Sequence, residues 1–189
     1  MAATAAGDEP ANGDDPGRSG LGVIHGRFQP FHTGHLEYLR LAAERSTNLV
    51  VGITNPENDA GPAEPSDPAR FTREANLFSY WERLGMIEAV LEDEGIRGAY
   101  VIPFPIEHPG RLAAYVPPAA THYLRVFDEW GWTKVRRLEG AGYRVVVLQP
   151  GATKTISGAE VRARLAGGGA WESLVPPGTA RVIRALGLA

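Results

Sequence analysis

The 189-residue sequence contains no cysteine, and this absence excludes several classes of chemistry at once. Disulfide bonds, zinc–thiolate sites, iron–sulfur clusters and thiol catalysis all require cysteine. A reducing compartment is therefore permitted, and we expect the protein to be cytoplasmic. The sequence also lacks any run of about 18 consecutive apolar residues, so no membrane-spanning helix is predicted.

An excess of positive charge is missing as well. The chain has 19 Lys and Arg residues against 22 Asp and Glu residues, which gives a formal net charge of −3. Without a general basic surface to hold a nucleic-acid backbone, we expect no nucleic-acid partner, and any anionic ligand must be bound locally. The apolar fraction of 43% and the charged fraction of 22% are typical of a globular protein.

The N-terminal 20 residues have neither a basic start nor an apolar centre, so they do not predict an export signal. They are rich in alanine, glycine, proline and carboxylates, which predicts a disordered tail over residues 1–20. The rest of the chain, residues 21–189, has the length of one domain.

Strand and helix patterns alternate along this domain. Short apolar runs predict strands at 21–26, 48–54, 101–103, 121–127 and 143–148. Helical spacing predicts helices from residue 33 and at 80–92, 132–138, 157–165 and 179–186. The alternation predicts an α/β fold: a Rossmann-like, doubly wound parallel sheet of about five strands with helices on both faces. Such sheets bind ligands at the carboxyl ends of their strands, where the strand order reverses.

The ten residues after the first predicted strand suit phosphate binding. They read Gly26-Arg27-Phe28-Gln29-Pro30-Phe31-His32-Thr33-Gly34-His35. Gly26 permits a sharp turn, Arg27 offers a fork of donors, and Gly34 leaves the helix start open. His32 and His35 lie three residues apart at the helix start, so both rings can face one anion beside free main-chain N–H groups. Each residue alone also fits a plain capped helix, but together they predict an anion site.

A second segment, Ile-Ser-Gly-Ala-Glu-Val-Arg at residues 156–162, has the same character. Ser157 begins a predicted helix whose free N–H groups attract phosphate, with Glu160 completing a capping-box pattern. Arg162 adds a guanidinium nearby, and Lys154 lies just upstream. We therefore expect the N-termini of two helices to face one phosphate-sized anion.

These two segments resemble the phosphate motifs of the nucleotidylyltransferase superfamily of the His-x-Gly-His type. The first is similar to that of archaeal-type nicotinamide mononucleotide adenylyltransferases, and Trp-Glu-Ser-Leu-Val-Pro at 171–176 resembles their C-terminal stretch. Ala159 departs from the pattern because it occupies a position where the family usually has threonine. A hydroxyl contact to phosphate is thereby lost, and Lys154 is the candidate to compensate.

The resemblance implies transfer of a nucleoside monophosphate from a nucleoside triphosphate, with ATP favoured, to a small phosphate-bearing acceptor, with release of pyrophosphate. It implies that the catalytic residues are His35, His32 and Arg162. The implied nucleotide- and phosphate-binding residues are Gly26, Arg27, Phe28, Gly34, Lys154, Ile156 and Ser157. We expect Mg²⁺ on the triphosphate itself, without a dedicated protein metal site.

The acceptor is less defined. Thr-Asn-Pro at 54–56 and Phe-Asp-Glu-Trp-Gly at 127–131 resemble cytidylyltransferases that act on small phosphonates or alcohol phosphates, which makes CTP with such an acceptor the alternative. The candidate acceptor-binding residues are Arg70, Arg73, Trp81 and Arg83. The long, proline-rich stretch 55–73 is expected to form a mobile lid on the acceptor side.

Two further classes compete with an enzyme of this kind. They are a nucleotide-binding sensor without turnover and, ranked last, an aminoacyl-tRNA synthetase core. The sequence leaves open the base, the acceptor and the oligomeric state, a homo-oligomer included.

Overall fold

The computed structural model describes residues 18–58, 72–149 and 151–188. Within these ranges the strands are β1 (Ser19–Gly26), β2 (Ser46–Ile53), β3 (Ala99–Pro103), β4 (Thr121–Leu124) and β5 (Arg144–Val147). The α-helices are α1 (Thr33–Ala43), α2 (Tyr80–Asp93), α3 (Glu129–Gly140), α4 (Gly158–Ala166) and α5 (Pro177–Ala185). Two 3₁₀ helices, η1 (Pro109–Ala114) and η2 (Glu172–Leu174), complete the described elements.

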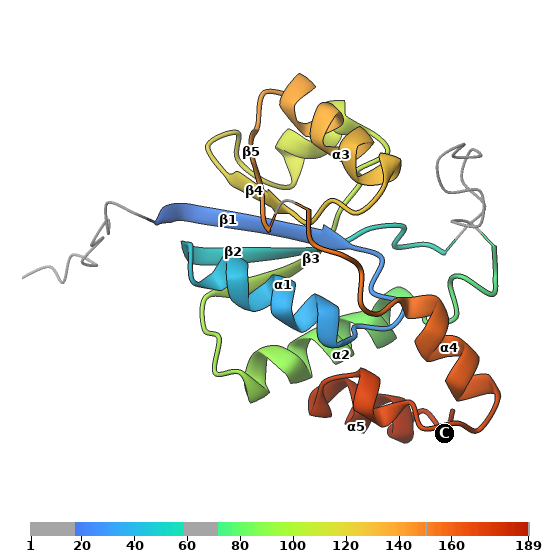
Figure 1. The fold of residues 1–189 in the computed structure, drawn as a ribbon. Coiled ribbons are helices and arrows are strands. Elements are labelled where there is room, and N and C mark those ends of the chain that lie inside the picture. The colour runs from blue at the N-terminus through green and yellow to red at the C-terminus, as the bar shows by residue number, and fades with distance from the viewer. Residues whose placement is uncertain (1–17, 59–71, 150, 189) are drawn as a thin grey trace, which may run out of the picture.

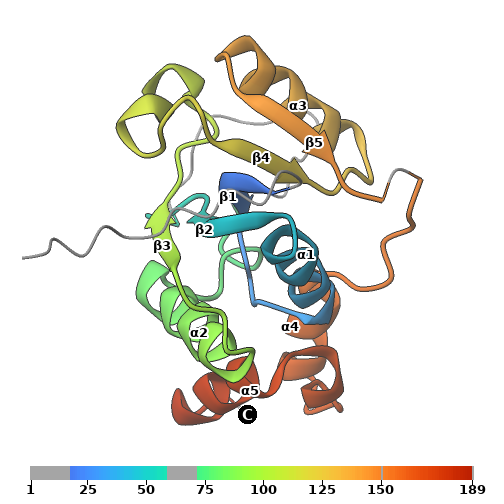
Figure 2. The ribbon, with the colours of Figure 1, turned by 90° about the vertical axis from the view of Figure 1, so that its left-hand side faces the viewer.

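The described strands form one parallel sheet in the order β3-β2-β1-β4-β5. The strand order reverses at β1, which pairs with β2 on one side and with β4 on the other. Figures 1 and 2 show α1, α2, α4 and α5 on one side of the sheet and α3 with η1 on the other. The predicted Rossmann-like, doubly wound sheet with helices on both faces is confirmed.

β1 and β2 are buried on both faces over most of their length, which explains why their sequences are continuous apolar runs. Val23 and Val50 join the hydrophobic cluster that includes residues of α3 and η1. Ile24 and Val51 point the other way, into the cluster that includes residues of α1, α2, α4 and α5. The alternation of side chains along each strand thus supplies both cores.

Helix starts follow their capping residues. At α2, Ser79 Oγ accepts a hydrogen bond from Glu82 N–H at 3.3 Å, and the Glu82 carboxylate accepts one from Ser79 N–H at 2.7 Å. The expected helix 80–92 is confirmed to within one residue. The expected helix 132–138 in fact begins at Glu129, because Asp128 Oδ1 accepts the N–H of Gly131 at 2.8 Å and caps α3.

The first strand begins earlier in the chain than the sequence predicts. β1 begins at Ser19, before the expected domain start at residue 21, and Arg18 donates a hydrogen bond to Ala43 O at 2.8 Å. The rest of the tail expected over residues 1–20, residues 1–17, lies outside the described residues. The lid expected over 55–73 lies largely outside the described residues.

No helix in the described ranges is long and apolar enough to cross a membrane.

One polar side chain is enclosed in the core beneath α3. His122 on β4 is 0% exposed, and in the described part of the chain neither ring nitrogen has a hydrogen-bond partner. Its ring instead contacts aromatic rings, with centroids 4.6 Å from Tyr143 and 5.8 Å from Phe104. Burial lowers the pKa of His122 from 6.5 to about 4.

We expect this buried imidazole to make the protein sensitive to acid. Between pH 6.5 and about 4 the unfolded chain binds a proton at His122 that the folded chain does not, so the free energy of unfolding falls as the pH falls. One such group contributes a slope of up to about 1.4 kcal/mol per pH unit. Urea unfolding measured across this range should show a shallower slope for His122→Phe than for wild type. Replacement of the exposed His108 by Asn is the control, and an unchanged slope in His122→Phe would contradict the expectation.

Candidate active site

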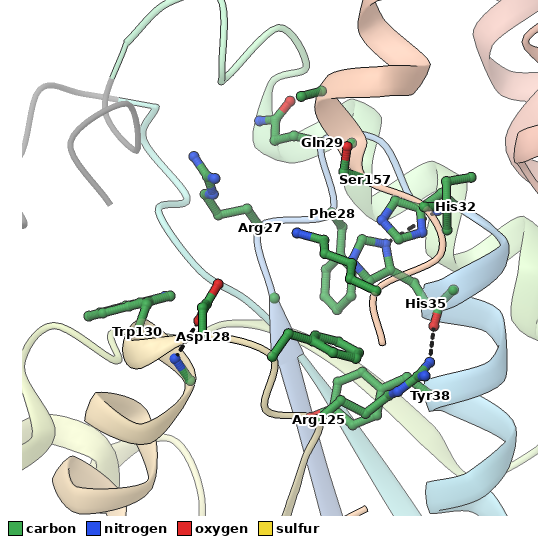
Figure 3. Close-up of a pocket in the computed structure, with 18 of the residues that line it drawn as sticks. Arg27, Phe28, Gln29, His32, His35, Tyr38, Arg125, Asp128, Trp130 and Ser157 are labelled. Atoms are coloured by element: carbon green, nitrogen blue, oxygen red, sulfur yellow. Dashed lines mark hydrogen bonds between the residues drawn. The ribbon is translucent and has the colours of Figure 1, made fainter. Parts of the chain in front are cut away.

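A pocket opens at the carboxyl ends of β1 and β4, where the strand order reverses. Its cavity has a volume of about 270 Å³. The N-terminal ends of α1 and α4 form one wall, and the connection from β4 into α3 forms the facing wall (Figure 3). Ligands of doubly wound sheets bind at this place.

Two stacked histidines lie at the start of α1. His32 is the N-cap residue of the helix, His35 lies in its first turn, and the two ring centroids are 3.6 Å apart. Nδ1 of His35 accepts a hydrogen bond from the main-chain N–H of His32 at 3.3 Å. A neutral His35 ring therefore carries its proton on Nε2, which is a hydrogen-bond donor.

Both imidazoles are neutral at pH 7. Burial, together with the positive charges of Lys154 and Arg125, lowers the pKa of His32 from 6.5 to about 3. Burial and then the neighbouring His32 lower the pKa of His35 well below its usual value. Each ring can thus offer an N–H to an anion, and its proton is already in place.

Two aromatic side chains pack against the ring of His35. The ring centroids of Phe28 and Phe31 lie 4.9 Å and 5.4 Å from that of His35. Phe28 is 1% exposed, and its ring packs edge-on against the ring of His35. Phe28 nevertheless belongs to the lining of the pocket, and its direct contact with a nucleotide stays a prediction.

The N-terminus of α4 lies in the same wall of the pocket as the start of α1. Ser157 is its N-cap residue, and Ser157 Oγ accepts the N–H of Glu160 at 3.2 Å. The reciprocal half of the expected capping box is replaced, because the Glu160 carboxylate accepts a hydrogen bond from Arg164 at 2.7 Å. Ser157, Gly158 and Ala159 line the pocket, and the first main-chain N–H groups of a helix have no acceptor within the helix.

Two glycines let the two helix starts approach each other. A Cβ at Gly34 would lie 3.0 Å from Cγ2 of Ile156, and a Cβ at Gly158 would lie 2.5 Å from the carbonyl oxygen of Gln29. Gly34 was expected to leave the helix start open, whereas here it admits the chain leading into α4. The structure brings the two phosphate motifs together at one pocket, and their contacts with phosphate stay predictions.

Several cations line this pocket. Arg27 and Arg162 come from the two predicted motifs, and Lys154 lies just upstream of the second. Arg162 is partly buried and donates from Nη1 to Gln29 O at 2.6 Å, so one arm of its guanidinium holds the loop that follows β1. Burial lowers the pKa of Arg162, but its protonated form still predominates at neutral pH. These cations give the described lining of the pocket a positive charge that suits an anionic ligand.

The facing wall contributes residues that sequence reasoning did not place in the site. Arg125 directly follows β4, donates to Glu37 at 2.7 Å and lies 5.0 Å above the ring of Phe127. Lys134 on α3 also lines the pocket, and its charge lowers the pKa of His35. The position of Arg125 directly after a central strand was the available signal, since ligands collect at strand carboxyl ends.

Three of the expected acceptor residues, Arg73, Trp81 and Arg83, lie in the described part of the chain. Arg83 was expected to bind the acceptor, but its side chain is fully buried and donates to main-chain carbonyl groups, so it offers no exposed surface to a ligand in this structure. Trp81, 77% exposed, and Arg73 are absent from the described lining of the pocket. Arg70 lies outside the described residues. Acceptor binding by Arg70, Arg73 and Trp81 stays a prediction.

The side chains that line the pocket include few possible ligands for the expected metal ion. In the described ranges no group of three or more His, Asp or Glu side chains could hold a metal. Asp128 is the one carboxylate in the described lining, and its Oδ1 already caps α3. Such a site fits Mg²⁺ that is bound mainly by phosphate oxygens and water.

Comparison with known proteins shows relatives along nearly the whole domain. The model of the family described as cytidylyltransferase-like matches residues 23–164. The phosphonoformate cytidylyltransferase of Streptomyces viridochromogenes is 44% identical over 172 residues, which cover 90% of this chain and 94% of that protein. The nicotinamide-nucleotide adenylyltransferase of Ignicoccus hospitalis is 33% identical over 177 residues, which cover 88% of this chain and 92% of that protein.

A solved structure shares the fold. The bifunctional NMN adenylyltransferase/ADP ribose pyrophosphatase of Francisella tularensis superposes with a TM-score of 0.64 at 16% sequence identity. The match covers 88% of this chain and 49% of that protein, so the present chain spans about half of its length.

Proposed function

Since the chain belongs to the cytidylyltransferase-like family and is a nucleotidyltransferase, we propose that it transfers a cytidylyl group from CTP to a small phosphonate acceptor. The observation that carries this choice is the 44% identity to a phosphonoformate cytidylyltransferase along 90% of the chain. The cation-rich pocket between two helix N-termini supports it, because both substrates are anions.

In the proposed reaction an oxygen of the acceptor attacks the α-phosphorus of the triphosphate. The new O–P bond forms as the bond from the α-phosphorus to the bridging oxygen breaks, and pyrophosphate leaves with that electron pair. The attacking oxygen is already anionic at neutral pH, so no general base is required. Catalysis then consists of positioning the reactants and stabilising the charge that develops on the phosphoryl oxygens.

The residues of the pocket divide this work. Nε2–H of His35 donates to an oxygen of the α-phosphoryl group as its charge grows, with His32 beside it. Arg162 and the main-chain N–H groups after Ser157 bind the departing pyrophosphate. Arg27 and Lys154 hold the remaining phosphate charge. Mg²⁺, when bound by the phosphate oxygens, supplies further charge neutralisation.

A second candidate is adenylyl transfer from ATP to nicotinamide mononucleotide, the choice favoured by the sequence motifs. The 33% identity to a nicotinamide-nucleotide adenylyltransferase supports it. The two candidates use the same phosphate chemistry and differ in the base and in the acceptor.

A substrate matrix decides between them. The protein is incubated with Mg²⁺ and each of ATP, CTP, GTP and UTP, in combination with phosphonoformate, other small phosphonates or nicotinamide mononucleotide, and pyrophosphate release is measured. We expect the fastest release with CTP and a small phosphonate, and none after chelation of Mg²⁺. Fastest release with ATP and nicotinamide mononucleotide would favour the second candidate, and triphosphate binding without release from any pair would indicate a sensor.

A further inference from the structure

Arg83 carries a buried positive charge that the reaction described above does not use. Its side chain lies on α2, is 0% exposed, and pairs with no carboxylate in the described ranges. Burial lowers the pKa of Arg83 to about 10, so the guanidinium is still protonated at neutral pH. A buried charge is unfavourable unless hydrogen bonds compensate it, and here oxygen atoms surround it.

These oxygens belong to three separate segments of the chain. Nη1 donates to Arg27 O at 3.0 Å and to Thr54 O at 2.9 Å, which joins the loop after β1 to the end of β2. Nη2 donates to Asn55 O at 2.9 Å, and Nε donates to Ser79 O at 3.1 Å at the start of α2. The planar fork of arginine can hold several carbonyl groups in fixed directions, which a lysine ammonium does not do.

Gln29 makes a second connection between the same segments. Its side-chain oxygen accepts the N–H of Phe78 at 2.8 Å, and its side-chain nitrogen donates to Phe78 O at 2.7 Å. The same nitrogen lies 3.2 Å from Oδ1 of Asn58. Gln29 is 3% exposed, so these hydrogen bonds are shielded from water.

The main chain of the loop at residues 27–29 also supports α4. Arg162 donates to the carbonyl oxygen of Gln29 at 2.6 Å, and Gly158 packs directly against that carbonyl. The position of residues 27–29 therefore sets where α4 lies relative to the histidines of α1. The phosphate-binding wall depends on a loop that is held from behind by the Arg83 and Gln29 side chains.

We propose that Arg83 and Gln29 form a clamp that positions the loop 27–29 and thereby aligns the two phosphate-binding helices for nucleotidyl transfer. The proposal rests on the proposed function. Neither side chain touches the substrates: each acts through the main chain of the loop. A misalignment of about 1 Å between reacting groups can lower a rate about 10²-fold, so small shifts of this loop matter.

The test uses Arg83→Lys, Gln29→Met and the control Arg40→Lys. Arg83→Lys keeps the charge but loses the fork, and Gln29→Met keeps the side-chain length but loses the hydrogen bonds. Arg40 is an exposed arginine on α1 that pairs with Glu94 at 2.6 Å. Steady-state kcat and both KM values are measured below the unfolding temperature of every variant. If Arg83→Lys does not fold, Gln29→Met carries the same test.

We expect kcat to fall about 10²-fold in Arg83→Lys and about tenfold in Gln29→Met, with both KM values changed less than kcat. Arg40→Lys should match wild type. A lower unfolding temperature with unchanged kcat would show a purely structural role and overturn the proposal. A raised KM for the acceptor with unchanged kcat would overturn it too, because Arg83 would then act as an acceptor ligand.

A separate measurement keeps this proposal apart from the proposed function. If wild type releases no pyrophosphate from any substrate pair, the proposed function fails. Calorimetric titration of the same proteins with inorganic pyrophosphate then decides the clamp. At least about tenfold weaker binding to Arg83→Lys and Gln29→Met than to wild type supports it, and equal binding overturns it.

Discussion

Replacement of His35 by alanine is expected to lower kcat about 10²- to 10³-fold, the effect of removing one preorganised donor from a charged transition state. The reason lies in the geometry of the ring. Its Nδ1 accepts a hydrogen bond from His32 N–H, so the proton is held on Nε2. The rings of Phe28 and Phe31 fix its orientation before a ligand arrives.

The matched variant is His35→Gln, whose side-chain amide places a donor near the position of Nε2. We expect kcat of His35→Gln to lie between wild type and His35→Ala, measured at saturating triphosphate and acceptor. Both variants lose contacts with the phenylalanine rings and should unfold at a somewhat lower temperature, which a thermal unfolding curve records. Wild-type turnover in a folded His35→Ala protein would remove His35 from the catalytic residues.

The fold was accessible from the sequence because its signals are local. Apolar runs of strand length, helical spacing and the Ser79–Glu82 capping box depend on residues close together in the chain. The boundary of α3 was misplaced because the cap at Asp128 lies within a stretch rich in aromatic residues, where the apolar spacing gives no clear start. Capping chemistry, rather than periodicity, sets that boundary.

The candidate site was accessible in part. The residues of the two phosphate motifs were found because each motif is contiguous and its helix N-terminus has a local signature. Arg125 and Lys134 were missed because their place in the pocket depends on β4 lying next to β1, a contact between distant segments. The burial of Arg83 was missed for a related reason: an arginine at a helix start is usually exposed, and only tertiary structure reveals the carbonyl groups around it.

Replacement of Arg162 by alanine is the other change from which we expect a large loss, about 10²- to 10³-fold in kcat/KM. Arg162 lines the pocket from the first turns of α4, and its Nη1 donates to Gln29 O at 2.6 Å. Alanine removes a cation that is proposed to stabilise the departing pyrophosphate and also an anchor between α4 and the loop after β1. Both losses act on the same reaction step, so we expect a larger effect than removal of an exposed cation produces.

Arg164→Ala supplies the matched control, because Arg164 lies on the same helix two residues further on. It donates to the Glu160 carboxylate at 2.7 Å and to Ala170 O at 3.0 Å, and it is absent from the described lining of the pocket. Initial rates of pyrophosphate release, measured at subsaturating substrate, should therefore fall strongly in Arg162→Ala and stay within about twofold of wild type in Arg164→Ala.

Arg162→Lys separates the effect of charge from that of geometry, because lysine keeps the positive charge but loses the planar fork that is proposed to hold Gln29 O and phosphate together. If Arg162→Lys restores the wild-type rate, charge alone suffices at this position; if it stays close to Arg162→Ala, the directed hydrogen bonds of the guanidinium are required.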